Sequence, residues 1–131
     1  MSSRDKTIVI VEDDSGMRQA MERLLTVSGL NPCTFADGTA LIEASAARSA
    51  RCLVLDVQLQ RDNGFDLYQR LLDMGIDCPV VFITAYDGAE PRRRAFVAGG
   101  AYLPKPFAGR ELVDMISSAI EAHSRRHPNG K

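Results

Sequence analysis

Four short apolar runs recur along the chain, and a carboxylate, hydroxyl or ammonium side chain follows each run. A run of about four to six apolar residues is typical of a strand buried on both faces, as in a parallel sheet covered by helices. Ligands bind outside the carboxyl ends of such strands, so we expect these polar side chains to meet in one crevice. The runs and the polar residues after them are 8–11 with Glu12 and Asp13, 53–55 with Asp56, 80–83 with Thr84, and 102–103 shortly before Lys105.

Segments with helical spacing lie between these runs. The clearest begins at Asp14 or Ser15, either of which can cap a helix, and it stops at Gly29. Residues 31–35 read as a short second strand. Further helices are predicted over residues 37–47, 65–74, 89–98 and 108–123, of which the first has an indistinct end and the third has a poor apolar face.

This alternation predicts an α/β fold with five β-α units. Right-handed crossovers place helices on both faces of the sheet, which gives a doubly wound, five-stranded parallel sheet of the flavodoxin-like type with five helices. Its expected strand order is 2-1-3-4-5, in which the first and third strands flank the switch point. Glu12, Asp13 and Asp56 are therefore expected to converge although they lie more than forty positions apart.

Length and composition fit one compact domain. The chain has 131 residues, of which 45% are hydrophobic, and we expect the domain over residues 5–123 and a polar tail or start of a linker over 124–131. The net charge of -1 argues against nonspecific nucleic-acid binding. No apolar stretch approaches the roughly 18 residues of a membrane span, and the polar start has no signal-peptide core, so we expect a cytoplasmic protein without a membrane partner.

The polar residues together predict phosphoryl-transfer chemistry. Three carboxylates in one crevice repel one another unless a cation lies among them, and carboxylate and carbonyl oxygens suit Mg²⁺. Lys105 can pair with Asp56 and later with a phosphoryl oxygen, while Thr84 offers a hydroxyl donor. The sequence has no G-x-x-x-x-G-K-[ST] motif, so the donor must bring its own phosphoryl group.

Taken singly, each of these residues has an ordinary structural explanation. An acidic pair after a strand commonly caps a helix, a lone aspartate commonly forms a turn, and a Lys-Pro pair is common in loops. Their order along the chain favours a shared site, because an acidic pair, an aspartate, a threonine and Lys-Pro follow the first, third, fourth and fifth strands.

These motifs resemble the receiver domains of two-component response regulators over residues 6–122. The sequence around Asp56 and Thr84 looks most like that of the FixJ branch. The matching motifs are Glu12-Asp13, Asp56 with Gly64 eight positions on, Thr84-Ala85, and Lys105-Pro106-Phe107.

The resemblance implies a phosphorylation site and a metal site. Asp56 would accept a phosphoryl group from a phosphohistidine on a sensor histidine kinase. Asp13, Asp56 and the backbone carbonyl of Gln58 would bind Mg²⁺, for which Mn²⁺ is an expected substitute, and Glu12 would act through the water shell of the metal. The chain is therefore not expected to be an enzyme, and it would catalyse only its own phosphotransfer and dephosphorylation.

The resemblance also implies a switch. Thr84, Ala85 and Lys105 would bind the phosphoryl group, and Tyr102 would turn inward and couple the site to the face formed by the fourth helix, fifth strand and fifth helix. The Lys105-Pro106 bond is expected to be cis. Phosphorylation would promote a homodimer through this face, and DNA would be contacted only through an effector domain absent from this chain.

Departures from the family pattern stand beside the metal site. Gln60 replaces the proline that this branch usually carries four positions after the phosphorylated aspartate, which predicts a more mobile loop, and Glu12 replaces the commoner aspartate. Gln58 and Tyr86 would flank the path of a hydrolytic water and tune the lifetime of the phosphoryl group, in a direction that the sequence does not give.

Several alternatives stay open. One is a receiver-like binding module that works without phosphorylation, and another is a haloacid-dehalogenase-like phosphatase, which would need an aspartate where Gln58 stands. Residues 92–94, all arginine, form either a solvated helix face or a specific contact with a partner or with nucleic acid. The chain is either a single-domain regulator or the amino-terminal piece of a longer transcription factor.

Overall fold

A computed structural model describes residues 7–126 of the chain. The five strands form one sheet in the order β2-β1-β3-β4-β5, and every neighbouring pair is parallel. The predicted strand order and the predicted flavodoxin-like fold with five α-helices are confirmed. In chain order the elements are β1 (Thr7–Val11), α1 (Ser15–Val27), β2 (Asn31–Phe35), α2 (Gly38–Ala44), the 3-10 helix η2 (Ala46–Ser49), β3 (Cys52–Asp56), α3 (Gly64–Asp73), β4 (Val80–Thr84), α4 (Ala89–Ala98), β5 (Ala101–Pro104) and α5 (Gly109–Arg126).

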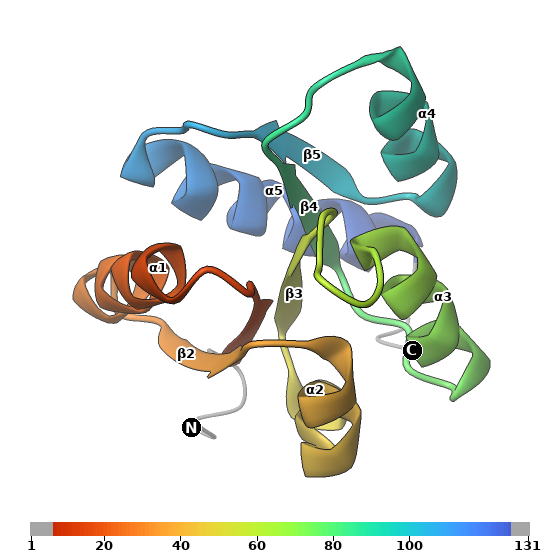
Figure 1. Cartoon of the computed structure of the whole chain (residues 1–131), viewed down its shortest axis with the longest axis horizontal. Helices are drawn as coiled ribbons and strands as arrows, with labels where there is room; N and C mark the ends of the chain where they lie inside the picture. The colour runs from red at the N-terminus through yellow and green to blue at the C-terminus, as the bar shows by residue number, and fades with distance from the viewer. Residues whose placement is uncertain (1–6, 127–131) are drawn as a thin grey trace.

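The helices cover the sheet on both faces, and each face has its own apolar core (Figure 1). Helices α1 and α5 pack on one face, where Ile8, Ile10 and Leu112 are completely buried. Helices α2, α3 and α4 pack on the other, where Phe82 lies against the rings of Phe65 and Tyr68 at centroid distances of 4.6 and 5.7 Å. Burial on both faces explains why the central strands read as unbroken apolar runs.

The caps at the ends of α1 follow the sequence prediction. The Asp14 side chain accepts a hydrogen bond from the Met17 N–H and caps the helix, and Gly29 has a φ of +86° just after the helix ends. Such left-handed backbone is the conformation that glycine adopts at low cost. The Asp14 cap holds the loop that follows β1 in place at the carboxyl edge of the sheet.

The predicted bounds of two helices were wrong by more than one residue, whereas α3 begins and ends one residue earlier than predicted. The helix predicted over 37–47 is split, because Ser45 has a φ of +58° and separates α2 from η2. Helix α5 continues to Arg126, so residues 124–126 of the predicted tail are helical, with Arg125 and Arg126 in a last turn where the helix dipole favours positive charge. The rest of that tail, residues 127–131, lies outside the described residues, as do residues 1–6.

The three cysteines are free thiols in the sheet region. Cys52 opens β3 and Cys78 immediately precedes the proline before β4, and both are buried, whereas Cys33 in β2 is half-buried. Among residues 7–126, no helix is both long enough and apolar enough to cross a bilayer.

Candidate functional site

The carboxylates that follow β1 and β3 form one cluster at the carboxyl edge of the sheet. Because β1 and β3 pair in register, Val11 opposite Leu55, the chain leaves both strands at the same level. Carboxylate oxygens of Glu12, Asp13 and Asp56 lie within 4.8 Å of one another. Glu12 and Asp56 are buried and Asp13 is half-buried, so the cluster opens to solvent on the Asp13 side.

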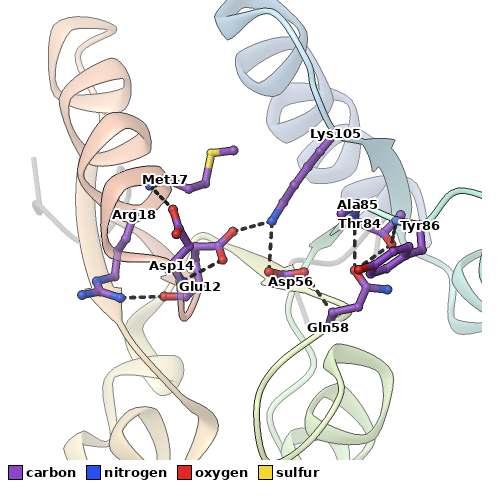
Figure 2. A network of polar contacts seen from close by, with 10 residues as sticks. All are labelled: Glu12, Asp14, Met17, Arg18, Asp56, Gln58, Thr84, Ala85, Tyr86 and Lys105. Carbon is purple, nitrogen blue, oxygen red and sulfur yellow. Dashed lines mark hydrogen bonds and ion pairs between the residues drawn. The ribbon is translucent and has the colours of Figure 1, made fainter.

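The Lys105 ammonium lies between two of these carboxylates. Its Nζ donates to Glu12 Oε1 at 2.8 Å and to Asp56 Oδ2 at 3.1 Å, as the dashed lines in Figure 2 show. The backbone of Lys105 is held by its N–H, which donates to the Thr84 carbonyl at 2.7 Å, and the Lys105-Pro106 peptide bond is cis. One positive charge therefore bridges residues that lie 93 and 49 positions away along the chain.

The electrostatics of the cluster fit a divalent cation. Burial, followed by the neighbouring Asp56 carboxyl, raises the pKa of Glu12, against the opposing effects of Lys105 and of the Asp14 N–H that donates to Glu12. Burial also disfavours the charged form of Lys105, but its hydrogen bonds with Glu12 and Asp56 outweigh that effect and raise its pKa. Three carboxylates with one ammonium leave a net negative, oxygen-rich cluster, which suits Mg²⁺.

A second set of polar contacts joins the end of β4 to the loop after β3. The Thr84 hydroxyl donates to Gln58 Oε1 at 2.9 Å, and the Ala85 N–H donates to the same oxygen at 3.2 Å. The Tyr86 N–H donates to Thr84 Oγ1 at 3.0 Å, and the Gln58 N–H donates to Asp56 Oδ1 at 3.0 Å. Figure 2 shows these groups beside Asp56, on the side away from Glu12.

Tyr102 contributes to a third network, which joins β5 to the loop after β4 and to α4. Its hydroxyl donates to Asp87 Oδ1 at 2.9 Å, and the Arg92 guanidinium lies 4.8 Å from the centroid of its ring. Arg92 also binds both carboxylate oxygens of Asp87, at 2.9 and 2.8 Å. These hydrogen bonds, from Arg92 first and Tyr102 second, lower the pKa of Asp87.

The loop after β3 is tied at its base. Gln58 and Asn63 form an antiparallel bridge, and the Gly64 N–H donates to the Val57 carbonyl at 3.0 Å. A methyl group on Gly64 would lie 2.6 Å from the Asp56 carbonyl oxygen, so this approach requires glycine. The tip, with Gln60 and Arg61, is exposed.

The sequence was compared with models of known protein families, and the family that matches has this arrangement of strand-end acids, threonine and lysine. Residues 8–117 match the family model of the response regulator receiver domain. The chain belongs to this family. It is thus a receiver domain of the kind found in two-component regulatory systems.

Named relatives support the assignment. The chain is 31% identical over 126 residues to nodulation protein W of Bradyrhizobium diazoefficiens, which covers 95% of the chain and 56% of that protein. It is 36% identical over 114 residues to the response regulator MprA of Mycobacterium ulcerans. That match covers 86% of this chain and 49% of MprA. The chain spans about half the length of the curated relatives it matches. These matches do not single out the FixJ-like branch, which stays a prediction.

Solved structures agree with the fold. The response regulator StyR superimposes with a TM-score of 0.82 at 31% identity, covering 94% of this chain and 63% of that one. A response regulator receiver protein from Burkholderia phymatum superimposes with a TM-score of 0.75 at 34% identity, covering 88% of this chain and 94% of that one. A CheY-like receiver domain from Methanospirillum hungatei gives 0.79 at 20% identity, which supports the fold alone.

The structure brings Glu12, Asp13, Asp56 and Lys105 together, as the sequence predicted, and it shows two supporting residues that the sequence did not predict. Arg18 on α1 donates to the Glu12 carbonyl at 2.8 Å and holds the acidic loop, and Asp87 binds Tyr102 and Arg92. The side-chain contact of Gln58 with Thr84 was also unforeseen. Arginines in the first turn of a helix, such as Arg18, and aspartates just before a helix, such as Asp87, are common. The sequence therefore gave no distinctive signal for either residue.

Proposed function

We propose that Asp56 accepts a phosphoryl group from a phosphohistidine on a sensor histidine kinase. A carboxylate oxygen of Asp56 attacks the phosphorus, the P–N bond breaks, and the leaving imidazole nitrogen keeps the electron pair and takes up a proton. The observation that carries the proposal is the position of Asp56 between the Lys105 ammonium and the Gln58 N–H, beside Thr84. A buried carboxylate with fixed donors around it is arranged as a positioned nucleophile.

The acidic cluster is the proposed site for Mg²⁺. The carboxylates of Glu12, Asp13 and Asp56 and the backbone carbonyl of Gln58 would hold the ion, with Glu12 acting through bound water, and Mn²⁺ would substitute. When bound there, Mg²⁺ would neutralise charge on the phosphoryl oxygens. Lys105 would pass from the Asp56 carboxylate to a phosphoryl oxygen.

Thr84 and Tyr102 are the proposed elements of the switch. The Thr84 hydroxyl and the Ala85 N–H would donate to the phosphoryl group, and Tyr102 would then turn inward and change the α4-β5-α5 face. A local charge event would in this way shift a two-state surface. One solved relative is described as a BeF3 activated receiver domain, which supports the use of a phosphoryl analogue to trap the second state.

The proposed output is control of a partner or of an attached domain in the cytoplasm. One relative is named transcriptional regulatory protein TdiR of Thauera aromatica, and the chain covers 51% of it. We propose that phosphorylation favours a homodimer, and that DNA is contacted only through such a further domain. The protein would catalyse only its own phosphotransfer and dephosphorylation.

Intact-mass analysis after incubation with MgCl2 and acetyl phosphate tests the proposal. The protein should gain one labile phosphoryl group, and Asp56→Asn or a chelator should abolish the gain, whereas Asp73→Asn on the exposed side of α3 should not. A stable mass without gain, in a protein that binds Mg²⁺ but does not bind beryllium fluoride, would contradict it and favour the phosphorylation-independent binding module.

A further inference from the structure

We infer that the Gln58 side chain is an internal competitor for the phosphoryl-binding donors and must leave them before a phosphoryl group can bind. The inference rests on the proposed function and adds to it a role of the Gln58 side chain in phosphoryl-group binding. Its amide oxygen accepts from both groups that would grip the phosphoryl oxygens, the Thr84 hydroxyl at 2.9 Å and the Ala85 N–H at 3.2 Å. In Figure 2 dashed lines join that oxygen to both groups.

The Thr84 hydroxyl has no second proton to offer. It gives its single proton to Gln58 Oε1, and its oxygen accepts from the Tyr86 N–H at 3.0 Å. Thr84 is completely buried, so solvent does not compete for the group. A phosphoryl oxygen can receive this hydrogen bond only when the amide oxygen of Gln58 withdraws.

The competing group also lies next to the reacting carboxylate. The Gln58 N–H donates to Asp56 Oδ1 at 3.0 Å, and β3 pairs with β4 so that Asp56 lies opposite Ile83, the neighbour of Thr84. The backbone at Gln58 is pinned by its bridge to Asn63. Withdrawal therefore needs only a rotation of the half-buried side chain, and the backbone carbonyl proposed for the metal stays in place.

A neutral amide oxygen is a weaker hydrogen-bond acceptor than a phosphoryl oxygen, so a phosphoryl group can displace Gln58 from the Thr84 and Ala85 donors. The amide occupies the donors in the resting protein and yields them to the stronger acceptor. Its removal should raise the affinity for a phosphoryl analogue by about tenfold, the effect of releasing two ordinary hydrogen bonds.

The test compares Gln58→Met, which keeps the length of the side chain without a strong acceptor, with Gln60→Met on the exposed tip of the same loop. Beryllium fluoride binding is measured by 19F NMR at fixed MgCl2, and Mg²⁺ affinity is measured separately as a check on the metal site. The expected result is an apparent Kd for beryllium fluoride about tenfold lower in Gln58→Met and unchanged in Gln60→Met. Amide exchange of Ala85, followed by NMR in the free protein, should speed up only in Gln58→Met.

The outcomes separate this inference from the proposed function. Equal or weaker analogue binding by Gln58→Met, with wild-type binding intact, overturns the competitor role and leaves Asp56 phosphorylation standing. Binding by Gln58→Met alone supports the inference in its strongest form. Absence of binding by both proteins, together with Mg²⁺ binding, contradicts the proposed function and the inference with it.

Discussion

At the scale of single residues, the site depends on one ammonium group that serves two buried carboxylates. The raised pKa of Lys105 means that its stabilising contribution is fully present below its ordinary value of 10.5 and is lost only as the pH rises through its higher folded value. At neutral pH the whole contribution is therefore present. Lys105→Met should lower the free energy of unfolding of the metal-free protein by about 2 kcal/mol, because it leaves Glu12 and Asp56 without their charged donor.

Urea unfolding with and without MgCl2 measures this effect. Excess MgCl2 should stabilise Lys105→Met more than it stabilises the wild type, because the cation replaces the missing positive charge. Lys105→Arg keeps the charge and is the matched control. Equal stability of Lys105→Met and wild type in chelator would contradict the bridging role.

Gly64 offers a second test at this scale. A methyl group there would meet the Asp56 carbonyl oxygen at 2.6 Å, whereas at Gly16 on α1 the nearest atom would be Asp14 Oδ2 at 3.5 Å. Gly64→Ala should therefore destabilise by about 1–3 kcal/mol through overcrowding, and it should shift Asp56. Gly16→Ala should be neutral or stabilising by up to about 1 kcal/mol. Denaturant unfolding of both variants checks the contrast, which equal effects would refute.

Residue types were easier to predict than side-chain contacts. Strand-end position placed Glu12, Asp13 and Asp56 in one crevice, because a parallel sheet brings its carboxyl ends together. The contact of the Gln58 amide with Thr84 depends on the rotamer of Gln58 and on the path of the loop after β3. The spacing of apolar residues predicts neither of these.

At the scale of elements, α4 is anchored differently from the other helices. Ala95 is its one fully buried residue, while Phe96 and Val97 are 83% and 71% exposed. Its start is tied to the rest of the protein by the bidentate pair of Arg92 with Asp87, which also binds Tyr102. A helix with so little buried apolar surface should open locally more readily than its neighbours.

Arg92→Ala should therefore raise amide hydrogen exchange in α4 severalfold without a matching change in α1. The cause is loss of the contacts that join the helix start to Asp87 and the Tyr102 ring. Arg93→Ala is the matched control, because Arg93 pairs with Glu90 within the same helix. Exchange that rises equally in both variants would show that helix propensity, and not the Asp87 contact, holds α4.

Element type followed from the sequence more closely than element ends. Strand β2 and helix α4 have the predicted bounds, and glycines lie beside them: Gly29 precedes the strand, and Gly88 and Gly99 flank the helix. The break at Ser45 carries no such signal, since serine adopts a positive φ here where glycine is the usual residue. The longer α5 reflects the ordinary difficulty of locating a helix end without glycine.

At the scale of the whole molecule, both faces of the sheet are closed and its buried thiols lie inside. Burial, followed by the charge of Asp77, raises the pKa of Cys78 from an ordinary 9.0 to about 12, and burial also raises the pKa of Cys52. The unfolded chain would release the Cys78 proton near pH 9, whereas the folded protein would keep it up to about pH 12. The folded state thus binds more protons in this window, and stability falls as the pH rises.

Replacement of Cys78 by alanine should reduce the loss of stability that accompanies rising pH. Between about pH 8 and about pH 10 the wild type should lose about 1.4 kcal/mol more unfolding free energy than Cys78→Ala, because only the wild-type unfolded chain gains the ionised thiol at this position. Urea unfolding at the two pH values under reducing conditions measures the difference. The comparison uses the change with pH, so any loss of packing from the smaller side chain cancels. Parallel losses in the two proteins would mean that the Cys78 thiol ionises as readily in the folded protein as in the unfolded chain, and that the core just before β4 is open to water.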